Sequence, residues 1–86
     1  MNFRIQQELE RVVGGGAVSV TDVATQTPAN PRVRLETAQS VYELPANRTL
    51  IFLEKLPDRI GVEAFREAIE RRFPSATQES DADRIP

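Results

Sequence analysis

The side chains that most often carry chemistry in enzymes are scarce in this chain of 86 residues. Cysteine and histidine are both absent. Without them the chain cannot build a metal site from thiolates and imidazoles, nor a nucleophile–histidine pair of the protease kind. Acid–base catalysis near neutral pH would then need an Asp, Glu, Lys or Tyr with a strongly shifted pKa. The composition therefore predicts a protein that is not an enzyme and that holds no cofactor.

Three local patterns resemble functional motifs, and each has a simpler structural interpretation. The glycine run 14–16 follows a predicted helix and precedes a predicted strand, which reverses the order found in phosphate-binding loops. Acidic residues alternate over 79–83 as in a calcium loop, but the required glycine and distal glutamate are missing. Tyr42, the sole tyrosine, is more typical of a core edge with its hydroxyl in water than of a catalytic acid. None of the three predicts a catalytic, cofactor or metal site.

Arginines form the most distinctive polar pattern. Lys55 is the sole lysine, so the other basic residues are all arginine. Arg32 and Arg34 alternate along a predicted strand and would share one face, where Arg48 could join them. Such a patch would suit phosphate groups, but the formal net charge of -2 gives no overall field that draws in DNA or RNA. A solvated polar face is the simpler interpretation, and nucleic-acid binding stays open as the alternative.

Periodicity and turn signals predict five elements that would position these residues. A helix with an apolar stripe ends at the glycine run, and a strongly amphipathic helix ends before Pro74. Between them, three segments rich in β-branched and apolar residues are typical of strands. The predicted order is helix 3–13, strand 17–27, strand 32–37, strand 49–53, and a helix that begins at 58 or just after Gly61 and ends at 73.

Two segments decide where the core lies. The run Thr-Leu-Ile-Phe-Leu at 49–53 stands between turn signals, which is the pattern of a strand buried on both faces. We therefore expect the core to centre on 50–53. The segment 38–44 fits neither period cleanly. The alternation over 32–37 favours a strand there, whereas Asn30 and Pro31 would suit the start of a helix, so both alternatives stay open.

Short connections between consecutive strands favour antiparallel pairing. The sequence therefore predicts an α+β fold of order α-β-β-β-α, a two-layer sandwich in which two helices cover one face of a three-stranded antiparallel meander. Residues 1–74 would form a single domain, and the polar residues 75–86 a disordered C-terminal tail. One face and two edges of the sheet would stay open, and open edges invite pairing with another chain.

These expectations favour surface recognition over chemistry. We expect a small non-enzymatic protein-interaction module, with an accessory, regulatory or assembly role, that acts through a sheet edge, a sheet face or a helix surface. The expected partner is another protein or a second copy of the chain. A nucleic acid bound by an arginine patch on the sheet is the alternative. The candidate interaction surface comprises Arg32, Arg34, Glu36, Tyr42 and Arg48.

The sequence also bears on location. No apolar stretch approaches the roughly 20 residues that span a bilayer, and the first residues lack the basic-then-apolar pattern of a signal peptide. We therefore expect no membrane partner and a cytoplasmic location.

Overall fold

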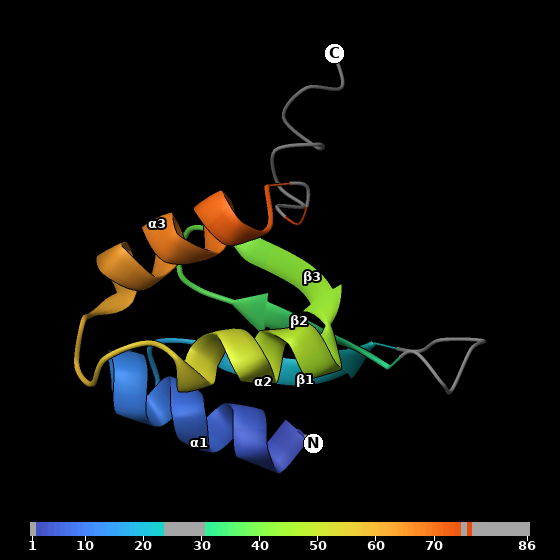
Figure 1. Cartoon of the computed structure of the whole chain (residues 1–86), viewed down its shortest axis with the longest axis horizontal. Coiled ribbons are helices and arrows are strands. Elements are labelled where there is room, and N and C mark those ends of the chain that lie inside the picture. The colour runs from blue at the N-terminus through green and yellow to red at the C-terminus, as the bar shows by residue number, and fades with distance from the viewer. Residues whose placement is uncertain (1, 24–30, 75, 77–86) are drawn as a thin grey trace.

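The computed structural model describes residues 2–23, 31–74 and 76. They form a three-stranded sheet with three helices packed on one of its faces (Figure 1). The strands pair in chain order and both pairs are antiparallel, which confirms the predicted α+β class and the meander. None of the helices in this described part is long and apolar enough to cross a membrane. The elements are α1 Asn2–Val13, β1 Ser19–Val23, β2 Arg32–Glu36, β3 Val41–Pro45, α2 Ala46–Glu54 and α3 Val62–Arg72.

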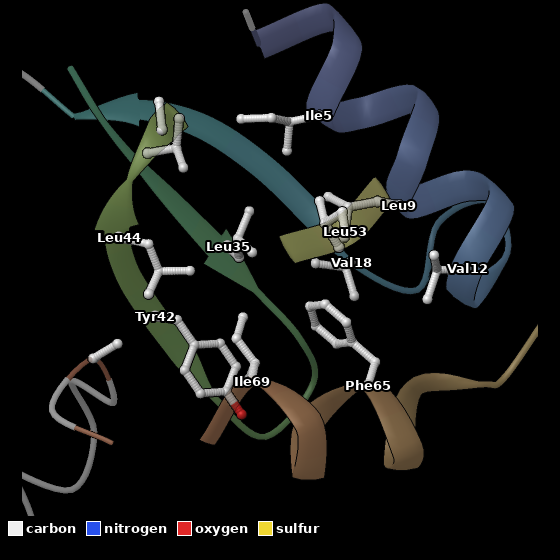
Figure 2. Packing of buried hydrophobic residues seen from close by; sticks show 13 residues of the cluster. Ile5, Leu9, Val12, Val18, Leu35, Tyr42, Leu44, Leu53, Phe65 and Ile69 are labelled. Atoms are coloured by element: carbon white, nitrogen blue, oxygen red, sulfur yellow. The ribbon is translucent and has the colours of Figure 1, made fainter. Parts of the chain in front are cut away.

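One face of the sheet is covered by the helices and the other is open. Val33 and Leu35 of β2 are buried, and so are Tyr42 and Leu44 of β3. The register places Val33 opposite Leu44 and Leu35 opposite Tyr42, so all four side chains point to the same face. They meet the apolar side chains of α1, α2 and α3 in a single core (Figure 2).

The third strand is not where the apolar run predicts it. β3 occupies Val41–Pro45, and the run 49–53 lies inside helix α2, so the prediction of a strand at 49–53 is wrong. Pro45 marks the switch, because proline has no backbone N–H with which to continue strand pairing. Thr49 then donates its hydroxyl to the Pro45 carbonyl at 2.8 Å and so closes the first turn of the helix. The segment 38–44 is thus a turn that leads into a strand.

Helix α2 is one helix more than the predicted order contains, and its position corrects the expected centre of the core. Within 50–53 only Leu53 is fully buried, whereas Ile51 is 54% exposed. The core lies instead between the helices and the covered face of the sheet, and α2 contributes Ala46, Thr49 and Leu53 to it. The other side of α2 faces outward.

Arg11 of α1 anchors the C-terminal end of α2. Its guanidinium donates to the carbonyl oxygens of Leu53 and Leu56 at 2.8 and 2.7 Å and to the Asp58 carboxylate at 2.6 Å. The last carbonyls of a helix have no partner within the helix, and here the Leu53 carbonyl accepts from Arg11 and also from the Leu56 N–H, at 3.0 Å. This clamp holds the end of α2 against α1.

Helix α3 begins at Val62, as the later of the two predicted starts requires, and buries Phe65 and Ile69. Gly61 precedes it with a φ of 89°, a left-handed conformation that glycine adopts without a Cβ penalty. Beyond α3, Ala76 is buried, and its carbonyl accepts a hydrogen bond from the Glu43 N–H of β3 at 3.2 Å. Apart from Ala76, the predicted tail 75–86 after Pro74 lies outside the described residues.

Candidate interaction site

The open face of the sheet carries three of the predicted site residues, Arg32, Arg34 and Glu36, and all three are exposed. Arg34 lies directly opposite Glu43 of β3 and forms an ion pair with it at 2.5 Å. This hydrogen-bonded pairing raises the pKa of Arg34. Two arginines and two glutamates thus share this face, so their charges balance and it offers no excess positive charge to phosphate groups.

Tyr42 does not belong to that surface, which corrects the prediction. It lies on the opposite, covered face of the sheet and is fully buried. Its hydroxyl is not in water but donates to the Glu70 carboxylate of α3 at 2.7 Å, while Arg66 donates to the Ser40 hydroxyl nearby at 3.1 Å. Burial disfavours the phenolate and raises the pKa of Tyr42. This polar cluster joins β3 to α3 and does not present Tyr42 to a partner.

The two sheet edges are less open than the meander suggests. On β1, Asp22 pairs with the buried Val33 of β2, so it lies on the helix-covered face, and it stays exposed there. An inward-pointing charge on an edge strand is a known protection against pairing with another chain. At the other edge, the Glu43 N–H of β3 already donates to the Ala76 carbonyl. Neither edge is an obvious template for strand addition.

The outer side of α2 carries a different combination of side chains. Arg48, Ile51, Phe52 and Lys55 recur at spacings of three and four, which places them on one side of a helix. Together with Leu56 and Arg72 of α3 they line a hollow of about 520 Å³. Its floor is apolar, formed by Phe52 and Leu56, which are half-buried.

Aromatic contacts hold the second wall of this hollow in place. The ring of Phe52 meets the ring of Phe73, which follows α3, edge-on with centroids 5.5 Å apart. The guanidinium of Arg72 lies 5.1 Å from the centroid of the Phe73 ring, a cation–π distance. These contacts keep the positive charge of Arg72 beside α2 although α2 and α3 are connected by a loop.

A second hollow, of about 290 Å³, adjoins the first because Arg48 and Arg72 line both. It reaches across to Arg32 at the start of β2 and to Ala76. We call the two joined hollows the α2–α3 groove; the residues that define it are Arg32, Arg48, Ile51, Phe52, Lys55 and Arg72.

The charges of the groove are not balanced. Its four cations, Arg32, Arg48, Lys55 and Arg72, form no ion pair with another residue in the described part of the chain. The acidic residue that lines the groove is Glu43, whose carboxylate pairs with Arg34 on the open face. The groove therefore combines an exposed isoleucine and an apolar floor with a rim of unpaired positive charge.

The groove is lined by two of the five predicted site residues, Arg32 and Arg48. Arg34 and Glu36 remain on the open sheet face and Tyr42 is in the core. Sequence reasoning missed Ile51 and Lys55 as groove residues because it assigned 49–53 to a strand. Their helical spacing from Arg48 was the available signal. Over residues 2–23, 31–74 and 76, no cluster of three acidic, histidine or cysteine side chains could hold a metal ion.

Comparisons of the chain with protein-family models, with curated proteins and with solved structures found no match.

Proposed function

We propose that this protein is a non-enzymatic protein-interaction module that binds an acidic segment of a partner protein in the α2–α3 groove. As the sequence predicts, the partner would be met in the cytoplasm. The proposal moves the interaction surface from the sheet to the helices, because Arg34 on the open sheet face forms an ion pair with Glu43, whereas the four cations of the groove form no ion pair in the described part of the chain.

The observation that carries the proposal is the exposure of Ile51. A single exposed apolar side chain is ordinary on a protein surface. Ile51, however, lines a hollow together with the half-buried Phe52 and Leu56, and the hollow is also lined by Arg48 of the same helix and by Lys55 directly after it. Binding energy at protein interfaces concentrates in such apolar centres surrounded by polar groups. This arrangement supports the proposal of a small interface at the groove.

The charge of the rim indicates the chemistry of the partner. Four cations without acidic partners favour a segment rich in Asp and Glu, and electrostatic complementarity of this kind speeds association and selects among partners. The apolar floor favours at least one aliphatic or aromatic side chain in the same segment. An acidic peptide with an apolar anchor satisfies both.

Nucleic-acid binding remains the second candidate, supported by a specific observation. Arg32, Arg48 and Arg72 converge on the smaller hollow, and arginine is well suited to phosphate groups. The apolar floor and the exposed Ile51 favour a protein partner over a polyphosphate backbone, and the net charge of -2 gives no general attraction to nucleic acids. The same experiment separates the two candidates.

The test compares two substitutions of exposed apolar residues. Tagged full-length protein, its Ile51→Asp variant and its Phe3→Asp variant are used to capture partners from extracts of the native host, with mass spectrometry of what is retained. Phe3 is 70% exposed on α1 and lines neither hollow of the groove, so Phe3→Asp is the matched control. We expect at least one protein that is retained by the wild type and by Phe3→Asp but lost with Ile51→Asp.

Two controls complete the test. Urea denaturation of each variant verifies that the fold is intact. Nuclease treatment of the extract removes partners held through nucleic acid, and loss of all retained proteins on this treatment would support the second candidate. Retention of the same proteins by Ile51→Asp and wild type would contradict the groove as the binding surface.

A further inference from the structure

The described chain ends at the groove. Ala76 lines the smaller hollow together with Arg48 and Arg72. It is held there by two backbone hydrogen bonds, from its own N–H to the Phe73 carbonyl at 3.1 Å and from the Glu43 N–H to its carbonyl at 3.2 Å. The residues that follow Ala76 therefore start within the site that the proposed function assigns to a partner.

The sequence that follows has the chemistry expected of that partner. Residues 77–86 read Thr-Gln-Glu-Ser-Asp-Ala-Asp-Arg-Ile-Pro. Glu79, Asp81 and Asp83 are acidic and alternate, and Ile85 adds an apolar side chain near the end. From these facts we infer that segment 77–86 occupies the α2–α3 groove of its own chain and competes there with the partner. The inference rests on the proposed function only in that both use the same groove.

The length of the segment fits the distance to be covered. From Ala76 to Asp83 an extended chain reaches up to roughly 23–25 Å. Along α2, Arg48 and Lys55 are separated by about 10 Å at a helical rise of 1.5 Å per residue. Alternate residues of an extended chain lie about 7 Å apart on one side, so three carboxylates can meet several of the groove cations at once.

Tethering makes weak contacts sufficient. Covalent attachment over a short stretch of chain holds a segment at an effective concentration in the millimolar range, so a segment with only millimolar affinity would fill the groove about half of the time. A partner must then displace it, and its apparent affinity falls by the fraction of time the groove is filled. At half occupancy the acidic segment thus weakens the apparent affinity of a groove ligand by about twofold.

The absence of cysteine provides a direct test. Ser80→Cys in the full-length chain creates a unique thiol for a nitroxide spin label, and amide NMR signals then report which surfaces the label approaches. We expect loss of signal at Arg48, Ile51, Lys55 and Arg72, and little loss at Thr21 on the open face. The loss should disappear when Glu79→Gln, Asp81→Asn and Asp83→Asn are combined, and in about 1 M salt, where the screening length is about 3 Å.

Two controls sharpen the result. Arg84→Gln changes the charge of the same segment in the opposite sense, so it should keep the signal loss. Contacts between molecules are measured in a mixture of two samples. One carries the spin label but no NMR isotope, and the other carries the isotope but no spin label. Signal loss in that mixture would assign the groove to a second copy and overturn the proposal for one chain, as would an unchanged pattern in the neutralised variant.

The outcome also separates the two proposals. If the label shows no contact with the groove while Ile51→Asp still loses a captured partner, the segment is not the occupant and the proposed function stands. If the contact is present but no partner depends on Ile51, the groove serves the chain's own segment and the proposed function fails. If both hold, the neutralised variant should retain more partner than the wild type.

Discussion

The two sides of helix α2 both carry apolar side chains, but these are buried on one side and exposed on the other. On the inner side, Leu53 is fully buried in the core, and the hydroxyl of Thr49 donates a hydrogen bond to the Pro45 carbonyl. On the outer side, Ile51 is exposed between Arg48 and Lys55. The apolar residues on the inner side belong to the core, whereas on the outer side Phe52 packs against the core in part and Ile51 stays exposed. The proposed function rests on this exposed side chain and on neighbouring cations that form no ion pair in the described part of the chain.

The largest expected effect tests this division within α2 itself. Leu53→Ala removes buried atoms and leaves a cavity, which should lower the free energy of unfolding by about 3 kcal/mol. Ile51→Ala removes atoms that are mostly in water and introduces a better helix former, so it should change stability by less than about 0.5 kcal/mol. Urea denaturation of the two variants makes the comparison. Similar losses for both would mean that the outer side also serves the core.

The same division explains why the sequence misplaced the third strand. An apolar run between turn signals predicts a buried strand on the assumption that apolar residues are buried. In α2 that assumption fails at Ile51, so the run resembles a strand apolar on both faces. Helix 3–13 and strand 32–37 were predicted well because α1 and β2 have one buried and one exposed side.

The candidate site was predictable only in part, because its composition depends on long-range pairing. The local sequence does not predict that Glu43 lies opposite Arg34, because that pairing depends on the register of β2 and β3. The burial of Tyr42 likewise follows from the phase of β3, which the turn at Thr37 to Ser40 resets through backbone hydrogen bonding at 2.8 Å. Arg72 joins Arg48 only through the packing of Phe52 against Phe73.

The second prediction concerns two neighbouring arginines in the last turn of α3. Arg72→Glu should reduce the amount of captured partner at least about tenfold, equal to about 1.4 kcal/mol of binding free energy, because it reverses a charge in the groove. Arg71→Glu has the same unfavourable effect on stability, because it also places a negative charge at the negative end of the helix dipole. Arg71 lines neither hollow, however, so the amount of captured partner should be unchanged. Equal losses would point to general charge rather than to the groove. The difference should shrink as salt is raised.

The third prediction addresses the buried polar cluster, which stands in contrast to the exposed cations. Tyr42→Phe removes the hydrogen bond to Glu70 and should lower the free energy of unfolding by about 1 kcal/mol near neutral pH, without affecting capture. Arg66 and Glu70 are the charged groups that face the hydroxyl. Denaturation of the variant and the wild type measures the loss. A loss of partner in Tyr42→Phe would contradict the purely structural role.

The pH dependence of this cluster has a definite sign. The pKa of Tyr42 is raised in the folded protein, so above about pH 10 the unfolded chain releases the phenolic proton while the folded chain still holds it. Stability from this residue is therefore fully present below about pH 10 and is lost as the pH rises toward the folded pKa. The advantage of the wild type over Tyr42→Phe should shrink in that range. Because Tyr42 is the sole tyrosine, tyrosinate absorbance follows its ionisation directly.

The smallest expected effect tests the balance of charge on the open sheet face. Wild-type protein and the Arg34→Gln variant should capture the same partner to within about twofold, since Arg34 lines neither hollow of the groove. Glu36→Gln combined with Glu43→Gln should instead release Arg34 and leave two positive charges without acidic neighbours on the face. A mobility shift with RNA or DNA at about 50 mM salt, where phosphate contacts are strong, should then rise above that of the wild type. If the wild type already binds equally well, its sheet arginines are accessible to phosphate despite Glu43, and the contrast between sheet and groove fails.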